Sequence, residues 1–272
     1  MTYFGAERSL LVKMPGQVHE TVEVAVTDHF KVQATQMGLM RRELQRIGSS
    51  QYASIHPDGG AAEPDDGLKP SEFRPGPDDF PTLVVEVARS QDINQAHKAK
   101  DWWFNHSSPD HERGGVGAVF IVKVVSDELG TLIAELWSRR AKRPKKATIQ
   151  LKDPNRYPDQ DQVNDNPDLW TWSGLPMRVA FEDLVLRPKA GLEHDFDVTS
   201  DMMVDAATSA WNYRGAAPRR WSLARQRADE ERQRQQQRRE EEQAKERRDQ
   251  DRDLRAERRR RTKLANEADD AK

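Results

Sequence analysis

The 272-residue sequence contains no cysteine. This absence excludes disulfides, catalysis by a thiolate, and zinc or iron-sulfur sites with cysteine ligands. The sequence also has no run of about 20 apolar residues that could cross a bilayer, and residues 1–17 lack the sustained apolar stretch of a signal peptide. We therefore expect a soluble intracellular protein, cytoplasmic or nuclear, with no membrane partner.

Common catalytic motifs are missing as well. There is no Gly-rich phosphate loop, nucleophile elbow or dinucleotide fingerprint, and "GGVG" at 114–117 precedes a predicted strand instead of a helix. The seven histidines do not recur at metal-ligand spacing, and we interpret His97 as part of a solvated helix surface. Kinase and Rossmann-type chemistry are therefore excluded.

Charge is distributed unevenly along the chain. Hydrophobic residues make up 35% and charged residues 33% of the sequence, and the mean hydropathy is −0.95. Residues 219–272 contain 19 Lys/Arg and 14 Asp/Glu, a net charge of +5, whereas the remainder contains 25 and 32, a net charge of −7. The sequence thus predicts an acidic body followed by a basic tail.

The Arg/Glu/Gln-rich tail over 215–272 has almost no large aliphatic residues and no heptad seam. Opposite charges four residues apart each stabilise a helix by about 0.2–0.5 kcal/mol. We predict a helical or disordered tail, better described as a solvated, partly frayed helix than as a coiled coil. Its Arg258–Arg261 run resembles a nuclear-import or nucleic-acid patch, so the tail is a candidate contact for DNA, RNA or a protein partner.

Residues 1–214 are predicted to form an α/β (α+β) domain. The apolar spacing from Val26 to Ile47 predicts a helix that stops at Gly48, and "SEFRP" at 71–75 predicts a strand beside the one containing Glu86. The other predicted elements are a helix over 93–106, strands over 117–125, 131–138 and 147–152, a loop over 155–168, a strand and turn over 175–188, and a helix over 200–214 with Ser200 or Asp201 as N-cap.

The segment "PTLVVEVARSQD" at 81–92 places one acid, Glu86, among apolar residues of a predicted central strand. An isolated buried carboxylate is costly. Glu86 therefore needs a cation, a metal ion or hydrogen-bond donors, or it stays protonated.

The phrase "LKPSEFRPGPDDFPTLVVEVARSQ", followed by "KAKDWWFNHS", "GAVFIVKV" and "LPMRVAFEDLVLRP", resembles fungal proteins of the restriction-endonuclease-like, PD-(D/E)XK superfamily over about residues 37–213. The resemblance implies a mixed central sheet flanked by helices, with the active carboxylates on adjacent strands. It also implies hydrolysis of DNA or RNA with Mg²⁺ or Mn²⁺ held by carboxylate oxygens.

On this resemblance Glu86 takes the position of the second metal-binding carboxylate. The first is an Asp in the family, and Pro70 stands there in this sequence. Glu72, Asp65 and Asp66 are the available substitutes, and Glu72 is preferred because it lies in a predicted strand.

The motif lysine is also replaced, since Ala88 stands two residues after Glu86. Lys100, on the following helix, or Lys123, in the next strand, could supply an amino group from another direction. The structural alternative is that Glu86 pairs with Arg74 or Lys123 in a decayed site.

Two adjacent tryptophans, Trp102 and Trp103, could stack on bases, but we predict that they anchor the core with one ring half exposed. Two functions thus remain open. One is a metal-dependent nuclease-like protein, with either an intact or a degenerate active site, and the other is a catalytically inactive scaffold or binding protein of the same fold.

Overall fold

The computed structural model describes residues 2–4, 9–11, 16–88, 93–110, 114–126, 130–152 and 166–214. The predicted tail from residue 215 and most of the predicted loop over 155–168 lie outside these residues. In the part of the chain so described, no helix combines the length and the apolar character that a membrane span requires.

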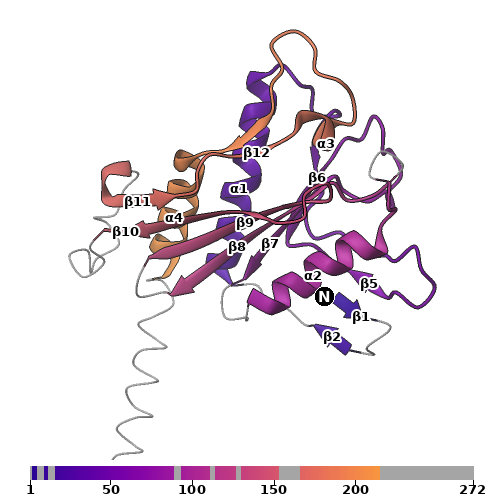
Figure 1. The fold of residues 1–272 in the computed structure, drawn as a ribbon, viewed down its shortest axis with the longest axis horizontal. Coiled ribbons are helices and arrows are strands. Elements are labelled where there is room, and N and C mark those ends of the chain that lie inside the picture. Colours follow the sequence, from indigo (N-terminus) through magenta and orange to yellow (C-terminus); the bar gives the residue numbers. More distant parts are fainter. Residues whose placement is uncertain are drawn as a thin grey trace, which may run out of the picture. The chain divides into compact units, whose positions relative to one another are not determined.

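Helices and strands alternate along the chain in a mixed α/β arrangement (Figure 1). In order they are β1 (Thr2–Phe4), β2 (Ser9–Leu11), α1 (Gln17–Gln36), β3 (Gln45–Arg46), β4 (Tyr52–Ala53), β5 (Ala61–Ala62), β6 (Asp66–Lys69), β7 (Leu83–Ala88), α2 (Ile93–His106), β8 (Ala118–Ser126), β9 (Thr131–Ser138), β10 (Lys145–Leu151), the 3₁₀ helix η3 (Pro167–Leu169), β11 (Trp170–Ser173), β12 (Met177–Val179), α3 (Phe181–Val185), β13 (Phe196–Val198) and α4 (Ser200–Arg214).

A mixed sheet of seven strands forms the centre, in the order β11-β10-β9-β8-β7-β6-β3. The β7 and β8 strands pair in parallel, and their other pairings in this sheet are antiparallel. A parallel pair needs a crossover connection, which α2 provides. Smaller sheets are formed by β2-β1-β5-β4 and by β12-β13.

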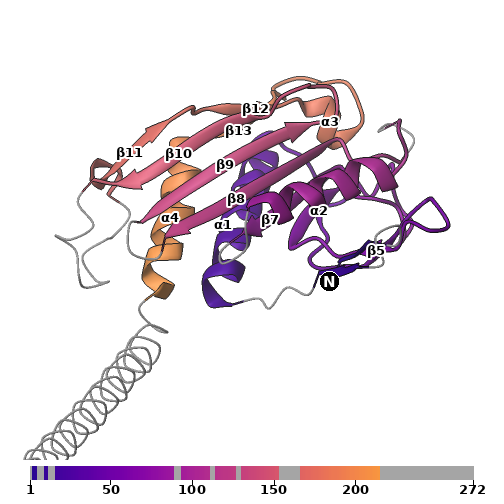
Figure 2. The same ribbon diagram turned by 60° about the horizontal axis from the view of Figure 1, so that its bottom comes forward.

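Alternation along β7 divides its side chains between two cores. Leu83, Val85 and Val87 belong to the core on the side of α1 and α4, and Val84 and Ala88 belong to the core on the side of α2. Figure 2 shows α1 and α4 lying beside each other, with α2 near β7 and β8. The sheet is therefore covered by two helices on one face and by α2 on part of the other.

Helix α1 ends at Gln36, so the prediction that it continues to Ile47 is wrong. Gly38 adopts a φ of 81°, and the amides of Gly38 and Leu39 donate to the carbonyls of Thr35 and Ala34. This hydrogen-bond pattern is a Schellman motif, which ends a helix at a glycine in the left-handed conformation.

The predicted strand over 71–75 is a turn. The amides of Phe73 and Arg74 both donate to the Pro70 carbonyl, at 3.0 and 2.8 Å. The strand that pairs with β7 lies earlier, at Asp66–Lys69, and places Asp66 opposite Val85. The expected pairing of Phe73 and Glu72 with the Glu86 strand is therefore wrong.

Several other predicted elements are confirmed, including the helix over 93–106 and the strands around Glu86 and over 131–138. The helix over 200–214 is also present, but its N-cap is Thr199, whose hydroxyl oxygen accepts from the Met202 amide at 3.2 Å. The side chain of Thr199 thus satisfies a backbone donor in the first turn of α4.

Candidate functional site

Glu86 lies in the middle of β7 on the face covered by α2, and only 2% of its surface is exposed. The apolar core on this face surrounds it, with Ile121 beside it on β8. The indole N–H of Trp103, on α2, donates to Glu86 Oε1 at 2.7 Å. Trp103 is fully buried and Trp102 nearly so, which confirms that the two tryptophans anchor the core, but the expectation that one ring is half exposed is wrong. The buried carboxylate therefore has a neutral donor from the core.

Asp66 points to the opposite face of the sheet from Glu86. It is fully buried against α1, where its Oδ2 accepts from Thr27 Oγ1 at 2.8 Å and forms an ion pair with Arg46. Its Oδ1 accepts from the Gly48 amide at 3.1 Å. These donors explain why a carboxylate is tolerated without exposure to solvent.

Asp65 has other partners, and Glu72 is exposed to solvent. Asp65 Oδ2 accepts from the Val87 amide at 2.7 Å and lies 3.0 Å from His19 Nε2 on α1. Glu72 is exposed in the turn after β6. The predicted ligands Glu86, Glu72, Asp65 and Asp66 therefore do not fit one shared Mg²⁺ or Mn²⁺ ion. Across the described ranges, no three His, Asp or Glu side chains are arranged to hold a metal ion.

The two candidate lysines lie on the α2 side of the sheet. Lys100 Nζ sits 4.1 Å from the ring centre of Trp137 and forms an ion pair with Asp101, so it points toward β9. Lys123 is half-buried on β8, opposite Ala88, two residue pairs beyond Glu86. The structure thus places Lys123 in the neighbouring row on Glu86's face and directs Lys100 away from Glu86.

Arg74, the other proposed partner of Glu86, donates to backbone carbonyls. Its guanidinium donates to the Phe80 carbonyl at 2.6 Å and to the Gly115 carbonyl at 2.8 Å. Burial lowers the pKa of Arg74 to about 10. Arg74 therefore ties together the loops at the start of β7 and β8.

A second buried acid on the α2 side of the sheet, Glu135 on β9, lies in the same row as Glu86. The register runs from Glu86 to Ile121, then to Glu135 and to Lys146 on β10. Two strand spacings, about 10 Å, separate the two acids across the sheet. Sequence inspection did not single out Glu135, because its partners come from distant segments.

Three side chains donate hydrogen bonds to the Glu135 carboxylate. His97 Nε2 lies 2.7 Å and Trp137 Nε1 2.9 Å from Oε2, and Lys146 Nζ lies 2.6 Å from Oε1. Burial alone raises the pKa of Glu135, but the hydrogen bonds from Lys146, His97 and Trp137 outweigh it, so the pKa is below its ordinary value. His97 is therefore bound to a carboxylate and is not simply part of a solvated helix surface, as its sequence context had suggested.

A polar cluster joins α1 to β6. Glu23 lies 3.6 Å from His19 and 3.9 Å from Arg46, beside Asp65 and Asp66. Burial is the largest influence on Glu23 and raises its pKa to about 7. Because Arg46 bridges Glu23 and Asp66, the cluster fastens α1 to the sheet.

The turn between β9 and β10 is strongly basic. Six of the nine residues over 138–146 are Lys or Arg, and none is acidic. Arg139 is held by the Val116 carbonyl, and Lys145 by the Arg178 carbonyl, each at 2.8 Å. Lys142 and Arg143 are exposed, and neither has a hydrogen-bond or ion-pair partner in the part of the chain that the structure describes. We call residues 138–146 the basic hairpin.

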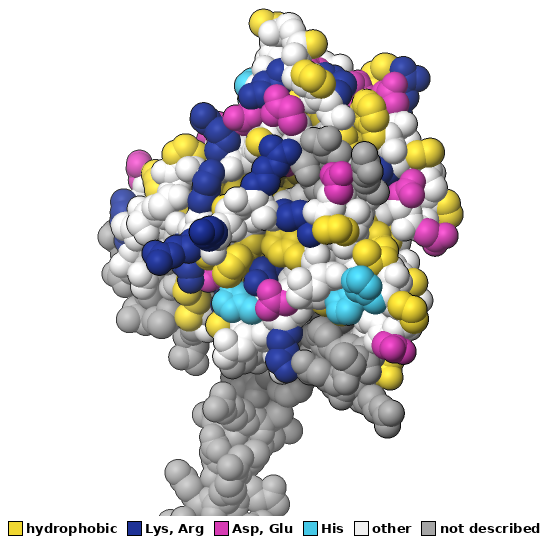
Figure 3. Space-filling model, turned by 45° about the vertical axis from the view of Figure 1, so that its right-hand side comes forward, with side chains coloured by type: hydrophobic (Ala, Val, Ile, Leu, Met, Phe, Trp, Pro, Cys, Tyr) yellow, Lys and Arg dark blue, Asp and Glu magenta, His cyan; other side chains and the backbone are white. Residues whose placement is uncertain are grey.

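Lys and Arg side chains gather around hydrophobic side chains in the view of Figure 3. The basic hairpin was identifiable from "SRRAKRPKK" between two predicted strands. The sequence interpretation missed this basic segment, because the net charge summed over the whole body is negative.

Comparison of the chain with protein-family models, curated proteins and solved structures finds no match. The functional argument therefore rests on the geometry of these residues.

Proposed function

We propose that the domain binds the phosphate backbone of a nucleic acid through the basic hairpin, on a restriction-endonuclease-like fold whose described residues do not assemble a catalytic metal site. The observation that carries this proposal is the concentration of six cationic side chains in nine residues of a body whose net charge is negative. Lys142 and Arg143, exposed at the tip, are available to phosphates. Such contacts are independent of sequence.

Two features favour binding over cleavage. Phosphodiester hydrolysis with Mg²⁺ needs several oxygen ligands around one ion. Here Glu86 faces α2 and accepts from Trp103, whereas Asp66 faces α1 and accepts from Thr27. Pro70 and Ala88, at the motif positions, provide neither a carboxylate nor an amino group.

The salt dependence of binding tests the proposal. Fluorescence anisotropy with labelled duplex DNA and with RNA is measured on the full-length chain and on the double variant Lys142→Ala/Arg143→Ala. Each lost phosphate contact reduces the slope of log K against log[salt] by about 0.9 on duplex DNA, so the double variant is expected to reduce it by about 1.8. An unchanged slope and affinity would overturn the proposal.

A charge-matched control is the double variant Lys31→Ala/Arg41→Ala, which removes two exposed cations from a different region. It is expected to keep most of the binding. An equal loss in both variants would mean that net charge alone governs affinity.

Cleavage is tested separately by incubating plasmid and single-stranded DNA with the protein and Mg²⁺ or Mn²⁺. We expect no metal-dependent cleavage. Cleavage that disappears in Glu86→Gln would instead establish the nuclease function.

A further inference from the structure

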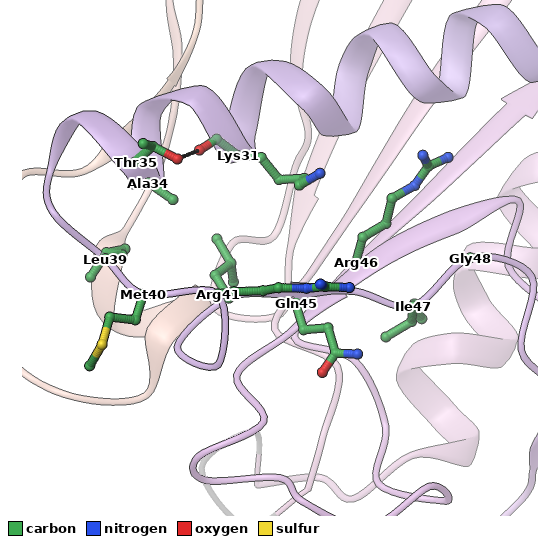
Figure 4. Close-up of a pocket in the computed structure, with 11 residues that line it drawn as sticks. Lys31, Ala34, Thr35, Leu39, Met40, Arg41, Gln45, Arg46, Ile47 and Gly48 are labelled. Atoms are coloured by element: carbon green, nitrogen blue, oxygen red, sulfur yellow. Dashed lines mark hydrogen bonds between the residues drawn. The ribbon is translucent and has the colours of Figure 1, made fainter.

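A cleft of about 710 Å³ lies between the second half of α1 and the segment 39–48, which includes β3. Figure 4 shows the side chains of Lys31 and Arg46 extending into the space between the helix and this segment, and the side chain of Arg41 lying along the segment. Sites for small organic ligands usually measure about 300–1,000 Å³. The cleft therefore has the size of a site for a small molecule.

Its charge is positive. Lys31, Arg41 and Arg46 all line the cleft, and none of the described residues that line it is acidic. Within the described residues the Arg41 side chain makes no hydrogen bond or ion pair, and the Lys31 ammonium has only Asp28, at 3.6 Å between exposed groups. Exposed ion pairs of this kind are weak, so the Lys31 ammonium can exchange Asp28 for another anion.

Arg46 plays a different part in the cleft. It is held by Asp66 and lies 3.9 Å from Glu23, which fixes its position at the end of the cleft. A guanidinium held in place by carboxylates loses less freedom when it binds a further anion. Arg46 is thus a cation in a fixed position. The exposed side chains of Arg41 and Lys31 can change conformation to contact a ligand.

The remaining lining is largely aliphatic, with Leu39, Leu44 and Ile47 among its members. Leu44 is nearly fully buried, so it forms a firm apolar surface beside the cations. A ligand that carries both an anionic group and an apolar or planar part would match these two kinds of surface.

The end of α1 works against an anion, because the carbonyls of a helix C-terminus carry partial negative charge. That effect is limited to the last turn of the helix. Charge-assisted hydrogen bonds from two or three cations are stronger than this effect. Arginine also binds phosphate oxygens with two parallel N–H groups, which favours a phosphate over a carboxylate of one negative charge.

We propose that this cleft binds a small organic phosphate of about the size of a nucleoside monophosphate. The site is formed by α1 and β3 and shares no residue with the basic hairpin, so it is independent of the proposed nucleic-acid binding.

Isothermal titration of the full-length chain with AMP, adenosine and inorganic phosphate tests the proposal. AMP is expected to bind at least tenfold more tightly than adenosine, because the phosphate meets the cations. AMP is also expected to bind more tightly than inorganic phosphate, because the aliphatic lining contributes. Equal affinity for AMP and adenosine, or no binding of AMP, would overturn the proposal.

Variants locate the site. Arg41→Ala and Lys31→Ala remove exposed side chains and are expected to leave the fold intact while reducing AMP affinity about tenfold each. Lys142→Ala/Arg143→Ala is expected to leave AMP affinity unchanged. Binding that is lost in the hairpin variant but kept in Arg41→Ala would place the phosphate on the hairpin and refute the cleft, whatever the outcome of the nucleic-acid measurements.

Discussion

Trp103 donates its indole N–H to Glu86 across 2.7 Å, inside the core between α2 and the sheet. Both residues are almost completely buried. The acid in the central strand and the second tryptophan of the helix that follows it are therefore one structural unit, which links β7 to its crossover helix.

This unit predicts different effects for two substitutions of Glu86. Glu86→Ala removes the acceptor of Trp103 and leaves a cavity, so we expect a loss of about 2–4 kcal/mol in the free energy of unfolding. Glu86→Gln keeps an acceptor oxygen and is expected to lose less than half of that. Urea unfolding followed by tryptophan fluorescence measures both, and equal losses would mean that the charge itself stabilises the core.

Glu135 predicts a loss of stability in acid. Its folded pKa lies below the ordinary value of 4.5, so it stabilises the fold above pH 4.5, and this contribution is lost as the pH falls through the folded pKa. Glu135→Gln is expected to reduce the unfolding free energy at pH 7 by about 1–3 kcal/mol, and less below pH 4. Glu72→Gln, an exposed acid in a turn, is the control and is expected to change little. A pH-independent effect of Glu135→Gln would contradict this account.

Glu23 is expected to give stability the opposite dependence on pH. Burial raises its pKa to about 7 in the fold, so between pH 4.5 and 7 the folded state binds more protons than the unfolded state. This group therefore lowers stability as the pH rises through that window. Glu23→Gln is expected to raise the melting temperature at pH 8 by about 2–4 °C, the change that 1 kcal/mol produces in a chain of this size. At pH 5 the two proteins are expected to melt together, and a lower melting temperature of the variant at pH 8 would refute the assignment.

Replacing Gly38 or Gly174 by alanine is expected to reduce the free energy of unfolding by different amounts. Gly38 has a φ of 81°, and a Cβ added there would have open space around it, since no atom lies within 4 Å. Gly38→Ala is expected to cost about 1 kcal/mol from backbone strain alone. Gly174 has a φ of 77°, and a Cβ there would lie 2.0 Å from the Lys146 carbonyl oxygen. Gly174→Ala is expected to cost more than twice as much, and equal urea midpoints for the two variants would be inconsistent with this packing.

The central elements could be predicted from the sequence because their signals are local. The β7 strand is a short run of β-branched residues, and α2 carries its apolar residues on one face. The end of α1 could not be predicted from spacing. Leu44 continues the helical apolar pattern, yet it is buried from a non-helical segment, whereas Met40 on the same predicted stripe is 53% exposed.

The candidate site was predictable only in part. The position of Glu86 in a buried strand follows from its neighbours, but its donor is 17 residues away on α2. Glu135 depends on a partner 38 residues before it and on the pairing of β9 with β10. Such contacts are set by strand register, which no local pattern specifies.

Helix α1 contacts elements that lie far later in the chain, namely α4 and the β13 strand. Gln33 exchanges two hydrogen bonds with the backbone of Asp197, at 2.8 and 2.9 Å, across a separation of 164 residues. A ribosome adding 5–20 residues per second needs about 8–33 s to cover that interval. During synthesis, the side of α1 that faces β13 and α4 therefore stays uncovered until those later segments have been made.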